Sequence, residues 1–176
     1  MKGIMTYLKI ALVVVSLFCA QQILAASTTI TDDSIVSSVQ SKLSGSQLTN
    51  ALPLTVTSNS GVVTLTGIVS NNTQAAKAVE LAEATPGVTD VDTSQLTING
   101  NQQPTSDSII TAKVKGALIR EHALGSSSLK GITVQTTDGV VSLIGTASSQ
   151  AQIDSATQIA KTVSGVKSVN TKLTVK

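Results

Sequence analysis

The segment GVVTLTG at residues 61–67 recurs as GVVSLIG at residues 139–145, 78 positions further along the chain (139 − 61 = 78). Apolar and polar side chains alternate in both segments, which predicts a β-strand with one buried face. A glycine ends each segment and indicates a bend or the close approach of another backbone. Repetition of a strand over this distance predicts two copies of one structural unit.

Three further landmarks recur in the same order. The offset between the copies is 78 for residues 87–88 and 165–166 (165 − 87), 77 for residues 96–98 and 173–175 (173 − 96), and 74 for residues 33–35 and 107–109 (107 − 33). Agreement in order supports a tandem repeat. The changes in offset predict that the second copy has four extra residues (78 − 74) and one deletion (78 − 77), both in loops.

Each copy has the same predicted order of elements, α-β-β-α-β. The first helix follows an N-cap at residues 31–33 or 105–107, where Thr, Ser and Asp oxygens accept from free backbone N–H groups. A β-hairpin, a second helix and a last strand come next. The strands are expected at residues 54–57, 62–69 and 91–98 in the first copy and at 132–136, 140–147 and 169–175 in the second. The second helices are expected at residues 73–84 and 150–163.

The helices carry one apolar stripe each, so they are expected to cover one face of a sheet. The stripes of the first helices are Ile35, Val39 and Leu43, and Ile110, Val114, Ala117 and Leu118. The predicted fold class is α+β, with two tandem domains that each pack two helices on a three-stranded mixed sheet. The glycines expected at turns are Gly61, Gly67, Gly87, Gly139, Gly145 and Gly165. Gly116 lies inside a helix, at a cost of about 1 kcal/mol relative to Ala, and indicates close packing or a partner contact.

The N-terminus has the order of a secretory signal peptide, with Lys2 and Lys9 before an apolar run at residues 10–20 and then small residues. That run is about half the roughly 20 residues that span a membrane. We predict a signal peptide at residues 1–25, a first domain at 26–98, a polar linker at 99–104 and a second domain at 105–176. Cleavage after Ala25 or Ala26 fits equally, and an uncleaved anchor is the alternative. Cys19 follows bulky Phe18, which argues against a lipoprotein anchor.

Removal of residues 1–25 also removes every Met, Cys and aromatic residue and two of the 12 Lys and Arg. The mature chain then has no net charge (10 − 10 = 0) and no thiol chemistry. His122 is the single histidine and is expected at a helix end, and Asp90 and Asp92 are expected to be solvated. No nucleophile elbow, metal-ligand cluster or phosphate loop is present in the sequence. We therefore expect no enzyme activity, metal, cofactor, small-molecule substrate or nucleic-acid partner.

The repeated strands 61–67 and 139–145, with the helix-ending Gly-Val pairs at 87–88 and 165–166 and the capped first helices, resemble the BON-domain family. The resemblance covers residues 31–98 and 105–175, nearly the whole mature chain. It implies a non-enzymatic protein of the bacterial periplasm or outer membrane, linked to envelope integrity and osmotic stress. Several such proteins bind anionic phospholipid, some through an aromatic anchor. The mature chain has no aromatic residue, so any membrane contact is expected to be mainly electrostatic.

Charge divides the two copies. Residues 26–103 have two Lys and six Asp or Glu (2 − 6 = −4), and residues 104–176 have eight Lys or Arg and four Asp or Glu (8 − 4 = +4). One interpretation is that the second copy faces an anionic phospholipid surface. The candidate contacts are Lys113, Lys115, Arg120, Lys130, Lys161 and Lys167. The alternatives are solvated surface charge, attraction between copies within or between chains, and a holdase-like module that binds envelope proteins.

Overall fold

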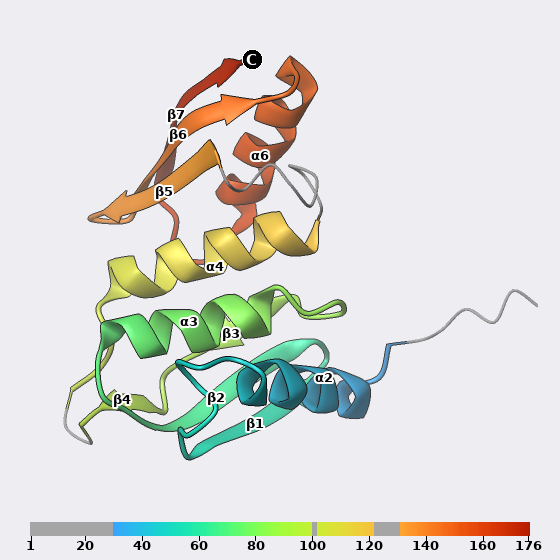
Figure 1. Cartoon of the computed structure of the whole chain (residues 1–176), viewed down its shortest axis with the longest axis vertical. Helices are drawn as coiled ribbons and strands as arrows, with labels where there is room; N and C mark the ends of the chain where they lie inside the picture. The colour runs from blue at the N-terminus through green and yellow to red at the C-terminus, as the bar shows by residue number, and fades with distance from the viewer. Residues whose placement is uncertain (1–29, 100–101, 122–130) are drawn as a thin grey trace, which may run out of the picture.

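The computed structural model describes residues 30–99, 102–121 and 131–176 (Figure 1). The first copy comprises α2 (Asp32–Ser44), β1 (Leu54–Asn59), β2 (Val62–Val69), α3 (Asn72–Glu83), β3 (Asp90–Asp92) and β4 (Leu96–Ile98). The second comprises α4 (Ser106–Arg120), β5 (Ile132–Thr137), β6 (Val140–Ala147), α6 (Gln150–Thr162) and β7 (Ser168–Val175). The predicted signal peptide and His122 lie outside the described residues.

Each copy forms a mixed sheet, so the predicted α+β fold class is confirmed. β1 and β2 are antiparallel, and β3 and β4 both pair with β2 in parallel. In the second copy β5 and β6 are antiparallel, and β7 is parallel to β6. Buried and exposed residues alternate along the central strands, as expected when helices cover one face of a sheet. Within the described residues, no helix combines the length and apolar character needed to cross a membrane.

A two-residue turn closes each hairpin. Ser60 and Gly61 have φ values of 52° and 81°, and Asp138 and Gly139 have φ values of 51° and 80°. Two consecutive residues with positive φ are the geometry of a type I′ turn, whose twist matches that of the flanking strands. This geometry explains the glycine that follows a small polar residue in both copies.

An aspartate at the start of the first helix holds this turn. The Asp32 carboxylate accepts hydrogen bonds from the Ser58 hydroxyl at 2.6 Å and from the backbone N–H groups of Ser60 and Gly61 at 2.9 and 3.0 Å. Asp107 likewise accepts from two backbone N–H groups of the second turn, both at 2.9 Å. These bonds fix the first helix against the hairpin in each copy.

The structure corrects the alignment of the first helices. Asp32 and Asp107 are equivalent, and the buried residues Ile35, Val39 and Leu43 correspond to Ile110, Val114 and Leu118. The offset between the first helices is therefore 75 (107 − 32) and not 74. Alignment on the shared Asp-Ser-Ile sequence is shifted by one residue from alignment on the buried residues. The second copy has three extra residues before its hairpin (78 − 75), and the prediction of four was wrong.

The predicted last strand of the first copy is interrupted. β2 pairs Thr64 with Asp92 and Gly67 with Leu96, so two residues of β2 face three residues, 93–95, between β3 and β4. The extra residue forms a bulge, with the Ser94 N–H donating to the Asp92 carboxylate at 2.8 Å. β7 has no such residue and runs unbroken. The change in offset from 78 to 77 is thus the signature of this bulge.

The two copies stack through their helices. α3 and α4 lie side by side between the two sheets (Figure 1), and α4 supplies Ile109 and Ala112 to the core of the first copy. A Cβ atom on Gly116 would lie 2.5 Å from the Glu83 Cβ and 2.8 Å from the Glu80 carbonyl oxygen. Gly116 therefore lets the two helices approach closely, so the copies form one continuous body.

The two first helices differ on their outward face. At the offset of 75, the buried α4 residues Ile109, Ala112, Lys113 and Gly116 correspond to the exposed α2 residues Ser34, Ser37, Ser38 and Ser41. Small and apolar residues let α4 serve both cores, whereas serines keep the same face of α2 solvated. This difference between the repeats fits the contact that α4 makes with α3 on that face.

Replacement of Gly116 by leucine tests the helix contact. We expect Gly116→Leu to lower the free energy of unfolding by about 1–3 kcal/mol, because the side chain has no space between α3 and α4. Ser41→Leu, at the equivalent exposed position of α2, is the control and is expected to change it by less than about 0.5 kcal/mol. Urea unfolding measures both, and equal effects would contradict the packing assigned to Gly116.

The turn contact predicts a pH effect. Hydrogen bonds from Ser58 and from the backbone of Gly61 and Ser60 hold the pKa of Asp32 below its ordinary value. The stability from this contact is therefore present at neutral pH and is lost as the pH falls through the lowered pKa. Asp32→Asn should lower stability at neutral pH and flatten its acid dependence, measured as urea midpoints. Asp33→Asn, next to it on the exposed surface, is the control and should lower the urea midpoint at neutral pH less than Asp32→Asn does.

Candidate functional site

Polar residues of both copies meet along one side of the α3–α4 contact. The Lys113 ammonium lies 2.7 Å from the Asp90 carboxylate and donates to the Ser164 hydroxyl at 2.8 Å. Ser164 in turn donates to Asp90 at 2.8 Å. Burial raises the pKa of Asp90, but the hydrogen bonds from Lys113 and Ser164 and the Lys113 charge outweigh it, so the pKa is lowered overall. This group joins β3, α4 and the segment after α6.

A second ion pair lies at the C-terminal ends of the same helices. Arg120 Nη1 donates to both Glu83 Oε1 and the Glu83 carbonyl oxygen at 2.9 Å, and Arg120 also lies 3.1 Å from Glu121. The Glu83 side chain is only 4% exposed, and its Oε2 atom is buried without a hydrogen-bond partner among the described residues. Burial raises the pKa of Glu83 against the opposing effect of Arg120.

We call these two groups the interdomain seam: Glu83, Asp90, Lys113, Arg120 and Ser164. The seam contains two of the predicted lipid contacts, Lys113 and Arg120. Lys113 is 7% exposed and its ammonium pairs with Asp90, and Arg120 pairs with Glu83. Two basic residues of the second copy thereby neutralise two acidic residues of the first. Asp90 is therefore part of a contact between copies, while its side chain remains 41% exposed.

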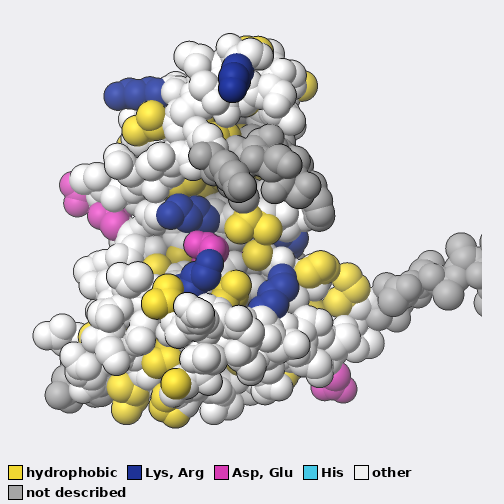
Figure 2. All heavy atoms as spheres, in the orientation of Figure 1, with side chains coloured by type: hydrophobic (Ala, Val, Ile, Leu, Met, Phe, Trp, Pro, Cys, Tyr) yellow, Lys and Arg dark blue, Asp and Glu magenta, His cyan; other side chains and the backbone are white. Residues whose placement is uncertain are grey.

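The other candidate lipid contacts are not brought together with the seam pairs. Lys161 and Lys167 are exposed on either side of the turn between α6 and β7. Lys115 is half-buried in a groove with Lys77 and Glu80, and Lys130 lies outside the described residues. Figure 2 shows basic side chains around an acidic one at the level where the two copies meet.

The six glycines named from the sequence all have positive φ, between 80° and 146°. Two of them show why a side chain is excluded. A Cβ on Gly67 would lie 2.4 Å from the Pro53 carbonyl oxygen, and one on Gly87 would lie 2.5 Å from Ile30. These glycines therefore allow the turns and the close approach of neighbouring backbone.

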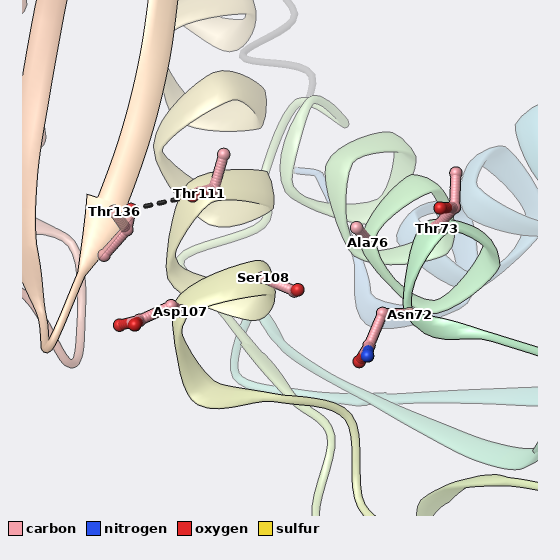
Figure 3. A pocket seen from close by; sticks show the side chains of 7 residues that line it. All are labelled: Asn72, Thr73, Ala76, Asp107, Ser108, Thr111 and Thr136. Atoms are coloured by element: carbon pink, nitrogen blue, oxygen red, sulfur yellow. Dashed lines mark hydrogen bonds between the residues drawn. The ribbon is translucent and has the colours of Figure 1, made fainter.

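Several hollows adjoin the helix contact. A cavity of about 200 Å³ borders the seam between Glu83, Asp90 and Arg120. A shallower groove of about 320 Å³ lies between the N-terminal ends of α3 and α4 (Figure 3). Its lining residues are Asn72, Thr73, Ala76, Asp107, Ser108, Thr111 and Thr136. Hydroxyl and amide groups line this groove, and the Asp107 carboxylate is already engaged by the hairpin turn.

No cluster of candidate metal ligands is found in the part of the chain that the structure describes. No three His, Cys, Asp or Glu side chains in that part lie together as metal ligands. The carboxylates of the seam are instead paired with cations from the other copy. The seam is therefore an interface within the protein, between its two domains.

Sequence reasoning did not identify Glu83 and Ser164 as seam residues. No local pattern marks them, because their partners come from the other copy. One signal was available: the α4 face with Ile109, Ala112 and Gly116 has no apolar counterpart in α2. A face that differs between repeats points to a contact that only one repeat makes.

The family model described as BON domain matches residues 31–100 and 106–176. The chain therefore belongs to the BON-domain family, and it carries two such domains. It is 36% identical over 152 residues to Osmotically-inducible protein Y of Escherichia coli (strain K12), covering 82% of this chain and 73% of that protein.

Solved structures show weaker similarity. The C-terminal domain of CdsD, a structural protein of the type III secretion system of Chlamydia trachomatis, gives a TM-score of 0.34 at 17% identity, over 84% of this chain and 68% of that chain. A second CdsD structure gives a TM-score of 0.34 at 14% identity, over 84% and 64%. Similarity at this level supports no conclusion about the fold or function of this protein.

A double-mutant cycle tests the Glu83–Arg120 pair. Arg120→Met should lower the free energy of unfolding by about 3 kcal/mol, because it leaves a buried carboxylate unpaired. Glu83→Met combined with Arg120→Met should restore the value to within about 1 kcal/mol of the unmodified protein. Arg120→Met should also be less destabilising at about pH 4 than at about pH 7, because protonation removes the buried charge. Additive effects of Glu83→Met and Arg120→Met in urea unfolding would contradict an interaction between the two side chains.

Proposed function

We propose that this chain is a non-enzymatic periplasmic protein that maintains the cell envelope under osmotic stress. The observation that carries the proposal is the 36% identity to Osmotically-inducible protein Y over most of both chains. The signal-like N-terminus at residues 1–25 supports export with cleavage of that segment.

The second domain is proposed to dock on anionic phospholipid. After the two seam pairs are removed from the count, the second copy keeps a charge of +2 (4 − 2) and the first keeps −2 (−4 + 2). Lys161 and Lys167 are exposed, and each lysine near an anionic surface contributes about 1 kcal/mol. Because Lys113 and Arg120 serve the seam, we assign docking to the exposed lysines, with Lys130 as a further candidate.

A protein-binding function is favoured by one different observation. Val62 and Ile68 are 39% and 50% exposed on the sheet face that the helices leave uncovered. Exposed apolar residues on a sheet offer contacts to unfolded or partly folded envelope proteins. Such binding would depend on apolar area and would tolerate salt, whereas lipid docking is screened by it.

Liposome sedimentation of residues 26–176 tests lipid docking. We expect the protein to sediment with vesicles containing phosphatidylglycerol and not with neutral phosphatidylcholine vesicles, and to be released at high salt. Lys161→Gln with Lys167→Gln should lower the vesicle partition constant about tenfold or more, since two contacts of about 1 kcal/mol each are removed.

The control has the same change in net charge on the other copy. Ser37→Glu with Ser41→Glu alters the exposed face of α2 and should leave vesicle binding nearly unchanged. Equal loss in both double variants would show that only net charge matters, and the surface assignment would fail. If the unmodified protein does not sediment with vesicles under any condition, the proposal of lipid docking is wrong.

A further inference from the structure

The last strand of each copy lies at an edge of its sheet, and the two edges differ. In the first copy the edge is occupied. Ile98 donates its backbone N–H to the Gln102 carbonyl at 2.6 Å and accepts from the Gln102 N–H at 3.2 Å. The bulge at residues 93–95 breaks the edge further, and the Gln103 side chain donates to the Ser94 carbonyl. A bulge and a neighbouring backbone segment of this kind disfavour pairing of a strand edge with another chain.

In the second copy the corresponding edge is open. β7 pairs only with β6 in the part of the chain that the structure describes, and it runs without a bulge over Ser168–Val175. Val175, the equivalent of Ile98, is 53% exposed, whereas Ile98 is 7% exposed. Among the described residues, the edge of the first sheet is thus covered and the equivalent edge of the second sheet is not.

The side chains of β7 are also incompletely covered. In the first copy Val91 and Leu96 are fully buried, and α4 adds apolar residues to that core. Their equivalents, Val169 and Leu173, are only half-buried. An added strand beside β7 would cover the apolar residues on this side, as the linker and α4 do for the first copy.

The free backbone groups of this edge can be assigned. Lys176 donates its N–H to the Ala147 carbonyl of β6 at 2.9 Å. Because the direction of the backbone groups alternates along a strand, even-numbered residues of β7 bond to β6. The N–H groups of Val169, Thr171, Leu173 and Val175 therefore point away from the sheet.

Charge indicates what such a strand would contain. Lys172 lies within β7 and Lys167 and Lys176 flank it, all three exposed, and β7 has no acidic residue. A second copy of β7 would bring like charges together, which is unfavourable between paired strands. An acidic strand would instead place carboxylates beside Lys172 on the uncovered face of the sheet.

We propose that the outer edge of β7 binds an extended polypeptide segment with alternating acidic and apolar residues, which adds a fourth strand to the second sheet. Its backbone pairs with Val169, Thr171, Leu173 and Val175, its apolar residues cover the helix-facing side, and its acidic residues meet the lysines. This binding mode is independent of lipid docking.

The probe is a fluorescein-labelled, end-capped ten-residue peptide of alternating valine and glutamate, measured by fluorescence anisotropy with residues 26–176. We expect saturable binding that is lost for the same peptide with alternate N-methylated backbone amides and for a valine–lysine peptide. Hydrogen exchange of the unmodified protein should show added protection at residues 169, 171, 173 and 175. Residues 170, 172 and 174 should change little, because their N–H groups already bond to β6.

Variants of β7 separate backbone pairing from side-chain contact. Thr171→Pro removes one outward N–H at an edge position that tolerates proline and should weaken peptide binding about fivefold or more, the fold-change of one hydrogen bond. Thr171→Ala is the matched control, because it also loses the contact with Thr157 but keeps the N–H. Lys172→Glu should weaken binding more than Lys161→Glu, which lies on α6.

The proposal is overturned by absence of saturable peptide binding, by equal affinity of Thr171→Pro and Thr171→Ala, or by protection that appears away from β7. Protection of the β7 amides without peptide, together with a dimer in sedimentation equilibrium, would assign the edge to a second copy and also overturn it. Thr171→Pro should bind phosphatidylglycerol vesicles like the unmodified protein. Failure of lipid docking and failure of strand addition are therefore observed separately.

Discussion

The close contact between α3 and α4 is the constraint on which the arrangement of the molecule depends. Gly116 leaves no side chain between the helices, so Glu83 and Arg120 can pair across them and Lys113 can reach Asp90. Burial of a charged group is unfavourable unless a partner compensates it. In each ion pair of the seam the acidic residue comes from the first copy and the basic residue from the second, so the pairs also specify how the two domains meet.

This contact changes the meaning of the charge asymmetry. The acidic first copy and the basic second copy suggest by composition an anionic target outside the protein. Half of that asymmetry is instead satisfied within the chain, since Lys113 and Arg120 neutralise Asp90 and Glu83. A smaller set of exposed lysines is left for an outside surface, which is why lipid docking is assigned to Lys161 and Lys167.

Two repeats of one fold act as internal controls for each other. The first copy protects its sheet edge with a bulge and with Gln102, and its core receives residues from α4. Among the described residues, the second copy has the same strand without these covers. Unpaired backbone groups of a strand edge can pair with another chain, and this difference between the repeats is the basis for proposing strand addition at β7.

The sequence by itself determined the repeat, the order of elements, the fold class and the turn glycines, because alternation, capping and glycine conformations are local properties. It also contained the bulge, as a change of offset from 78 to 77. The tertiary structure alone decided the seam, the double role of α4 and the one-residue correction to the helix alignment. Glu83 and Arg120 are 37 positions apart, and contacts of that separation depend on how elements pack and not on the pattern within any one of them.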